Sequence, residues 1–353
     1  MERSYTGKEH IAAVFRRERT DRLPVRVFHG LRPGLELAGV SAKEVRTEPD
    51  KYVLVLAALY EVLPQDAVSV LVADEALFAE AAGKRLGFTF ADVRARAAAG
   101  TSLLEDRSTL AQFELPDLEQ GDRLPYYLEI CQGALSAIPD VAVDPMFTSP
   151  WSTAMMMRGP QNMLLDIQDD PSFLRELLGY TTELANMVGA ALLETGVDVL
   201  TLADPSAGCS LISPAMFRQW VEPYLRETIE HLKDLSDTPI VLHICGYIDP
   251  IMEDLVSLGV DGISIDGPSS LERLVEVSHG RVVVEGNCPT GLYLRGTAEE
   301  IEAQVRECVD VAATGNAYIL CSGCQVPDNA PLENVRHFLE FGRRYGRHEK
   351  AAA

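Results

Sequence analysis

The residue types best suited to hold a metal include a histidine and a cysteine in one short segment. His243 and Cys245 lie two residues apart at the end of the apolar run 239–245. If that run is a β-strand, residues two apart point to the same face, so an imidazole and a thiol project together from its end. A nitrogen and a sulfur side by side are donors that Zn²⁺ accepts, provided that further ligands come from elsewhere in the chain.

A pair of cysteines that could complete the set follows the apolar run 317–320. Cys321 continues that run, and Cys324 comes after Ser322 and Gly323, where glycine lets the backbone approach a ligand closely. One histidine and two cysteines leave a fourth, open zinc position, which is typical of a catalytic site. Two alternatives stay open, a Cys-x-x-Cys redox couple and a closed structural site that uses both thiols.

The other cysteines are predicted to be structural, because free cysteine is commonly a small buried hydrophobe. The chain has seven cysteines, an odd number, and its N-terminus lacks the apolar core of a secretion signal. We therefore expect reduced thiols, some of them metal-bound, and not a disulfide framework. The cysteines expected to be structural are Cys131, Cys209, Cys288 and Cys308.

Composition narrows the class of protein. The 353 residues carry 31 basic and 53 acidic side chains, a net charge of −22, which argues against non-specific binding to nucleic acid or to an anionic membrane. No run of about 18 or more apolar residues could span a bilayer. Hydrophobic residues make up 47% of the chain, as expected for a globular enzyme, and we expect a cytoplasmic location.

Short apolar runs alternate with longer segments of helical character. Eight runs rich in β-branched residues are expected to be strands, at 24–28, 67–74, 141–147, 199–204, 240–245, 262–266, 282–287 and 318–323. Helices are expected at 7–18, 50–62, 171–195, 214–235, 249–258, 269–278, 297–314 and 331–345. Eight strands alternating with helices predict an α/β protein with a (β/α)8 TIM barrel, and a doubly wound open sheet is the alternative.

Local signals support several of these helices. Ser213 before Pro214 is a typical N-cap with proline in the first turn, and Thr297 with Glu300 forms a capping-box pattern. The stretch 83–130 interrupts the alternation of strands and helices. We interpret it as an insertion after the second strand, within a single barrel domain that spans residues 1–353.

Polar residues at the ends of the expected strands are candidates for the active site, which a TIM barrel places at the carboxyl ends of its strands. His243, Cys245 and Cys324 occupy such ends, as do Asp204 and Asp266. Either aspartate could orient His243 through its second ring nitrogen, the role that partners of metal ligands commonly play. Each aspartate could instead cap a helix. Further polar residues at strand ends are Asp74 and Asn287.

Several motifs resemble the uroporphyrinogen decarboxylase superfamily, and within it the corrinoid-dependent methyltransferases. The similarity begins at 7–25 and continues through 169–178 and 202–218. The segments that carry it most clearly are Leu-His-Ile-Cys-Gly-Tyr-Ile-Asp-Pro-Ile (242–251) and Ser-Gly-Cys-Gln-Val-Pro (322–327). These segments match the family's zinc motif, a His-x-Cys pair followed much later by a single cysteine.

The resemblance implies zinc ligands His243, Cys245 and Cys324, and so favours Cys324 over Cys321. It implies a methyl group moved between a corrinoid, free or on a corrinoid protein, and a thiol or tetrahydrofolate acceptor. Transfer in the reverse direction, to Co(I), stays open, as does a non-catalytic zinc-stabilised accessory protein. The segment 26–37 lacks the arginine-rich signature of the true decarboxylases, which makes porphyrinogen decarboxylation the weaker interpretation.

Overall fold

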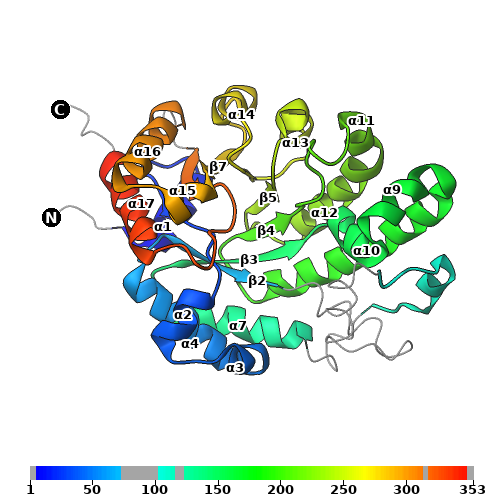
Figure 1. Cartoon of the computed structure of the whole chain (residues 1–353), viewed down its shortest axis with the longest axis horizontal. Coiled ribbons are helices and arrows are strands. Elements are labelled where there is room, and N and C mark those ends of the chain that lie inside the picture. The colour runs from blue at the N-terminus through cyan, green and yellow to red at the C-terminus, as the bar shows by residue number, and fades with distance from the viewer. Residues whose placement is uncertain (1–4, 73–101, 116–122, 313–316, 348–353) are drawn as a thin grey trace.

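Eight parallel strands form one sheet that curls into a barrel surrounded by helices (Figure 1). The computed structural model describes residues 5–72, 102–115, 123–312 and 317–347. The strand order is β1-β8-β7-β6-β5-β4-β3-β2, which is the order of a TIM barrel, and all eight predicted strands are present. Their bounds are β1 Val25–Arg26, β2 Ala67–Leu71, β3 Ala142–Thr148, β4 Leu200–Ala203, β5 Ile240–Ile244, β6 Gly262–Ile265, β7 Val283–Cys288 and β8 Tyr318–Ser322.

Helices cover the outside of the barrel. Those that match predicted ones are α1 Gly7–Phe15, α4 Pro49–Val62, α10 Pro171–Glu194, α12 Glu222–Leu235, α13 Met252–Val256, α14 Leu271–Ser278, α16 Ala298–Ala312 and α17 Leu332–Tyr345. Helices that the sequence reading missed are α2 Arg32–Ala38, α3 Ala42–Thr47, α7 Arg123–Ala137, α8 Pro150–Arg158, α9 Pro160–Asp169 and α15 Thr290–Arg295. The described residues also form short helical segments: α11 Pro214–Met216, η1 Arg107–Gln112, η3 Asp249–Ile251 and the π-helical η2 Phe217–Val221.

The predicted caps form as expected. The Ser213 hydroxyl accepts a hydrogen bond from the Met216 amide, and Thr297 exchanges backbone-to-side-chain bonds with Glu300. Much of the predicted insertion, residues 83–101 and 116–122, lies outside the described residues, so the insertion stays a prediction. Residues 123–130 of that stretch are the first half of α7, which lies beside α4 in Figure 1.

The interior of the barrel is built in layers by the alternation of side chains along each strand. The lowest layer is apolar and is closed from below by Ile11 and Val14 of α1. Two residues further along each strand, the same alternation places a polar side chain. This polar layer takes one residue from each of the eight strands: Arg26, Ser69, Asp144, Thr201, His243, Ser264, Glu285 and Cys321. Residues that follow on the same face of each strand lie at the mouth of the barrel. His243 therefore belongs to the polar layer, and Cys245 and Cys324 lie just above it.

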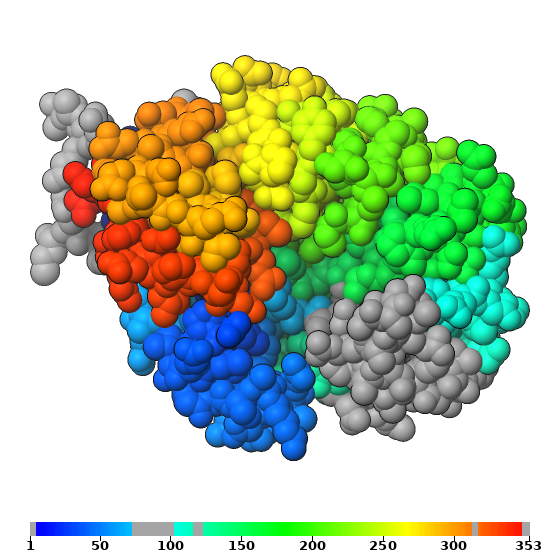
Figure 2. Space-filling model, viewed as in Figure 1, coloured from blue at the N-terminus to red at the C-terminus, as the bar shows by residue number. Residues whose placement is uncertain are grey.

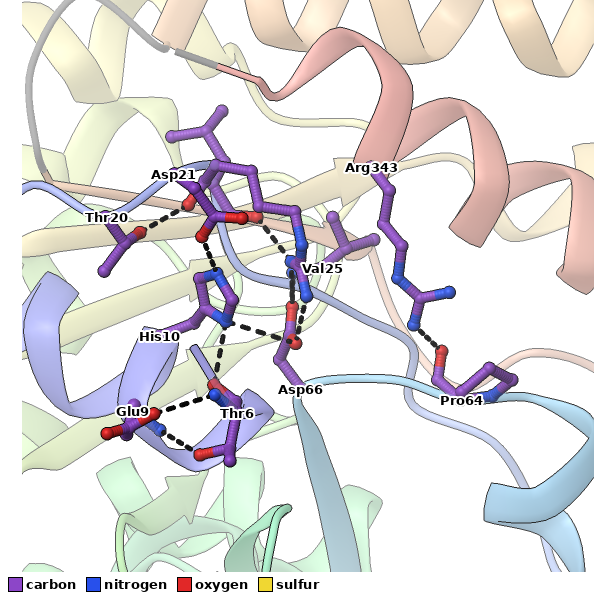
Figure 3. A network of polar contacts seen from close by, with 11 residues as sticks. Thr6, Glu9, His10, Thr20, Asp21, Val25, Pro64, Asp66 and Arg343 are labelled. Atoms are coloured by element: carbon purple, nitrogen blue, oxygen red, sulfur yellow. Dashed lines mark hydrogen bonds and ion pairs between the residues drawn. The ribbon is translucent and has the colours of Figure 1, made fainter. Parts of the chain in front are cut away.

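A buried network of polar contacts closes the seam between β1 and β2 at the amino-terminal end of the barrel (Figure 3). The Asp66 carboxylate accepts two hydrogen bonds from Arg22, at 2.6 and 2.7 Å, and one from the Val25 amide at 2.7 Å. The Asp66 amide in turn donates to the Val25 carbonyl at 3.0 Å. His10 lies beside this group and bonds Asp21 at 2.8 Å, which ties α1 to the same seam.

Asp66→Asn is expected to lower the free energy of unfolding by about 2 kcal/mol, because it leaves the Arg22 guanidinium without its charged partner. The effect stays moderate because 15% of the Arg22 side chain is exposed, so water can solvate it. Urea unfolding at neutral pH measures the change. The exposed pair of Arg16 and Glu18 supplies a control, since Glu18→Gln should cost less than about 0.5 kcal/mol. Equal effects of the two substitutions would contradict this role for Asp66.

Candidate metal centre

Three donor atoms converge at the mouth of the barrel. The Cys245 sulfur lies 3.3 Å from His243 Nε2 and 3.6 Å from the Cys324 sulfur, and all three donors lie within 4.8 Å of one another. Tetrahedral zinc would separate two sulfurs by about 3.8 Å and a sulfur and a nitrogen by about 3.5 Å, given its usual bond lengths. The residues therefore fit a zinc ion closely. Within the described ranges they are the only cluster of this kind.

Glycine lets the end of β8 bring Cys324 to the other two donors. A Cβ atom on Gly323 would lie 2.7 Å from the Gly267 amide nitrogen and 3.0 Å from the Asp266 carboxylate. A side chain at this position would push β8 away from the loop after β6. Gly323 thus lets the backbone approach a neighbour closely, as the sequence suggested. The neighbour that it approaches is the loop after β6.

Cys321 is not part of the cluster, although it competed with Cys324 in the sequence reading. Its side chain belongs to the polar layer below the mouth and is fully buried. Burial and the nearby Glu285 carboxylate raise the pKa of the Cys321 thiol well above its usual value. Its sulfur does not belong to the group of donor atoms that lie within 4.8 Å of one another. The geometry of the described residues therefore favours the three-donor set with Cys324 over a closed site that uses both thiols.

His243 is oriented by a serine. Its Nδ1 atom lies 3.0 Å from the Ser264 hydroxyl on the neighbouring strand β6, which leaves Nε2 directed toward Cys245. The aspartates expected in this role have other contacts: Asp204 donates its backbone amide to the His243 carbonyl at 2.8 Å and does not bond the imidazole. The expectation that Asp204 or Asp266 bonds the imidazole is therefore corrected. The short side chain of Ser264 reaches the ring because both residues face the barrel interior in register.

Asp266 fixes the two loops that carry the site. Its carboxylate accepts hydrogen bonds from the Gly246 amide at 3.0 Å and from the Gly267 amide at 2.7 Å. Gly246 follows Cys245 directly and adopts a positive φ of 76°, a conformation that glycine tolerates. Asp266 thereby holds the turn after Cys245 in place. Its position suits a residue that supports the loop carrying Cys245.

Asp204 is fully buried at the end of β4. The Ser152 hydroxyl, near the start of α8, donates to its Oδ1 atom at 2.5 Å, while Oδ2 has no hydrogen-bond partner among the described residues. Burial raises the pKa of Asp204 to about 7, and hydrogen bonds from serines oppose the shift only in part. The carboxyl group is therefore protonated in the folded protein over a pH range in which an exposed aspartate is ionised.

The raised pKa of Asp204 predicts a pH dependence of stability. In the unfolded chain this carboxyl ionises near its usual pKa of about 3.9, whereas the folded protein keeps the proton up to pH about 7. The free energy of unfolding should therefore fall as pH rises through this window, and Asp204→Asn should remove that loss, on the order of 2–4 kcal/mol. Urea unfolding of chelator-treated protein at pH 5 and pH 8 measures it. Parallel curves for wild type and variant would contradict the burial argument.

The two thiols of the site differ in acidity. A hydrogen bond from Cys245, supported by His243, lowers the pKa of the Cys324 thiol. The same contact raises the pKa of Cys245. A cation seated between the two sulfurs would favour the loss of the proton from both thiols.

Sequence reasoning missed the charged group beneath the site. Arg26 donates to Asp144 at 2.6 Å and lies 3.4 Å from the Glu285 carboxylate, and all three side chains are buried. The Phe28 ring contacts both this group and the metal centre, since its centre lies 4.6 Å from the Arg26 guanidinium and 5.4 Å from the centre of the His243 ring. The sequence did contain a sign of this group, because each of three apolar strands carries one charged residue. A buried charge without a partner is costly, so three such residues indicate that they pair.

Comparison with known proteins establishes the relationship. The family model described as Uroporphyrinogen decarboxylase (URO-D) matches residues 6–345. The chain belongs to this family. The resemblance noted from the His-x-Cys and Gly-Cys segments is thereby confirmed, and so is the barrel that it implied.

Methyltransferases are among the similar members of the family. Methylcobamide:CoM methyltransferase MtaA of Methanosarcina barkeri is 28% identical over 243 residues, which cover 65% of this chain and 66% of that protein. Methylcobamide:CoM methyltransferase MtbA of Methanosarcina mazei is 23% identical over 357 residues, covering 97% of this chain and 98% of that protein. A solved methyltransferase from Methanosarcina mazei has the same fold, with a TM-score of 0.77, 23% identity and coverage of 97% and 99%.

Among the described residues the longest helix is α10, and it carries charged side chains along its length. A search of the described helices finds none with the length and apolarity needed to cross a membrane.

Proposed function

We propose that this protein is a zinc-dependent methyltransferase that moves a methyl group between a corrinoid and a thiol. The observation that carries the proposal is the open His243–Cys245–Cys324 donor set at the barrel mouth, with spacing that fits tetrahedral zinc. The names of the relatives, which are methylcobamide:CoM methyltransferases, support the same reaction. We further propose a cytoplasmic setting, where thiols stay reduced.

The chemistry needs a thiolate at neutral pH. A free thiol has a pKa of about 8.5, and zinc at this site would lower that value for a substrate thiol. The thiolate attacks the methyl group in line, so the S–C bond forms while the Co–C bond breaks and its electron pair stays on cobalt. The proton of the thiol leaves to solvent. In the reverse direction Co(I) attacks a methylated sulfur, and the same residues serve both directions.

The residues of the site suit alkyl transfer. Two cysteine sulfurs supply negative charge, which keeps a neighbouring thiolate electron-rich, whereas a histidine-rich site would favour the activation of water. Ser264 fixes the imidazole, and Asp266 fixes the turn after Cys245. Cys245 and Cys324 are partly exposed at the mouth, so a methyl group on a separate corrinoid protein can approach them.

The alternatives make different demands on the site. Metal-free decarboxylation of a porphyrinogen gives a paired thiol set no role, and an accessory protein would need zinc for its fold. Tetrahydrofolate as acceptor would not use thiol activation, which favours a thiol. Chelation separates the accessory protein from the proposal, because a structural zinc would unfold the protein on removal.

The test is an assay of methyl transfer from methylcobalamin to a panel of small thiols. The visible absorption spectrum of the corrinoid measures the transfer. Zinc-loaded protein should demethylate methylcobalamin in a thiol-dependent way. Chelated protein should be inactive while keeping its circular dichroism spectrum, and zinc should restore activity. Thiol-independent turnover, full activity without metal or unfolding on chelation would each overturn the proposal.

A further inference from the structure

A large cavity lies beside the barrel mouth, outside the ligand cluster. Its volume is about 590 Å³, within the usual range for small-molecule sites. It lies among α2, α3, α4 and α7, which Figure 1 shows together at the lower edge of the barrel. In Figure 2 the blue surface of α2–α4 lies directly below the red C-terminal helix. Leu71 at the end of β2 and Gln325 and Asp328 after β8 complete the wall on the barrel side.

The inner wall of the cavity is apolar and aromatic. Tyr52, Tyr126 and Tyr127 line it together with aliphatic side chains, and all three tyrosines are buried. The Tyr52 hydroxyl accepts a hydrogen bond from the Leu71 amide at 3.3 Å, a bond that does not use the hydroxyl's own proton. Such a wall suits a flat or otherwise apolar body of ring size.

The charged part of the lining is cationic. Arg32, Arg46 and Arg123 line the cavity, against a single carboxylate from Asp328. Three arginines around one cavity stand out in a chain whose net charge is −22. The Arg123 guanidinium lies 4.4 Å from the centre of the Tyr126 ring and donates to the Arg46 carbonyl at 2.8 Å, so it is held in position over the aromatic wall. Guanidinium groups recognise carboxylate, sulfonate and phosphate oxygens.

The cavity adjoins the metal centre through one residue. Gln325 lines the cavity and directly follows Cys324 in the chain. A ligand in the cavity therefore lies next to the segment that carries Cys324. This continuity distinguishes the cavity from an incidental surface hollow.

We propose that this cavity binds an organic anion with an aromatic or similarly apolar body. The three tyrosines would contact the apolar body, and Arg46 would bind the anionic group. The proposal concerns binding alone and does not depend on methyl transfer. It can therefore be tested on protein without metal, and its outcome is separate from that of the transfer assay.

The test is calorimetric titration of the full chain, chelator-treated, with naphthalene-2-sulfonate and its neutral analogue naphthalene-2-sulfonamide. The sulfonate should bind about tenfold more tightly, because only the anion forms charge-assisted hydrogen bonds with guanidinium groups. Arg46→Gln should weaken sulfonate binding about three- to tenfold and leave the sulfonamide unchanged. Lys43→Gln removes the same charge from the same helix at a position that does not line the cavity, and should have no effect.

A second variant tests the location. Ala42 lines the cavity from an exposed position at the start of α3, so Ala42→Trp should fill the space without disturbing the core and should abolish binding of both probes. Equal affinity for the two probes would overturn the proposal, as would equal effects of the Arg46 and Lys43 substitutions. Unchanged binding in folded Ala42→Trp protein would place the anion elsewhere and overturn it too.

Discussion

Cys324→Ser is expected to remove bound zinc and to lower the rate of methyl transfer on the order of 100-fold or more, while the barrel stays folded. The serine hydroxyl is far less acidic than the thiol, so it cannot replace the thiolate that lies 3.6 Å from Cys245. The fold should persist because Cys324 lies after β8, at the mouth and partly exposed, away from the apolar layers. Elemental analysis, transfer assays and circular dichroism on the same preparation measure the three effects.

Cys321→Ser is the matched control, because it makes the same replacement three residues earlier. Its side chain is fully buried beside Glu285, so this change should alter stability and not zinc content. The wild type and Cys321→Ser should each hold about one zinc per chain, as a single three-donor set requires. Loss of zinc from Cys321→Ser with retention in Cys324→Ser would reverse the assignment of the third ligand.

Arg26→Met is expected to lower the free energy of unfolding by about 3–5 kcal/mol, the largest effect on stability that we predict. The Arg26 side chain is 2% exposed and pairs with Asp144 and Glu285, which are equally buried. Methionine fills similar space but leaves two carboxylates without a cation. Burial already raises the pKa of Glu285, and Arg26 opposes that shift, so its removal should drive Glu285 to the neutral form. Chemical unfolding measures the loss.

The double variant Arg26→Met with Glu285→Gln tests the charge argument. Removing this carboxylate together with its cation should recover part of the lost stability, because Glu285 no longer has to take up a proton at neutral pH in order to stay buried. Arg344→Met, at a position where 67% of the side chain is exposed, should change stability by less than about 0.5 kcal/mol. A double variant no more stable than Arg26→Met would indicate that packing, and not charge, sets the effect.

The strands of the barrel and the three candidate ligands were predictable from the sequence, for a shared physical reason. Buried parallel strands appear as short apolar runs, and the alternation of side chains places His243 and Cys245 on one face. The carboxyl ends of such strands meet at one rim, so distant residues such as Cys324 can be assigned to the same site. The preference for Cys324 over Cys321 depended on the family resemblance and stays a prediction, and in the structure it is Cys324 that lies beside His243 and Cys245.

The interactions around the site were not predictable, because they depend on how strands register across the barrel. Ser264 contacts His243 only because β5 and β6 pair at those residues. Arg26 meets Asp144 and Glu285 across the interior, a relationship that no local pattern contains. The missed helices α8 and α9 lie in the connection between β3 and β4, where a strand–helix–strand pattern predicts only the one helix α10.

Zinc K-edge X-ray absorption on the zinc-loaded protein, before and after addition of a thiol that supports methyl transfer, tests the central claim most directly. The ligand set of His243, Cys245 and Cys324 predicts two sulfur ligands at about 2.3 Å without the thiol and a third when it is added. An unchanged count of two would contradict activation of the thiol at zinc. A count of three or more before addition would indicate a closed site with no position left for a substrate.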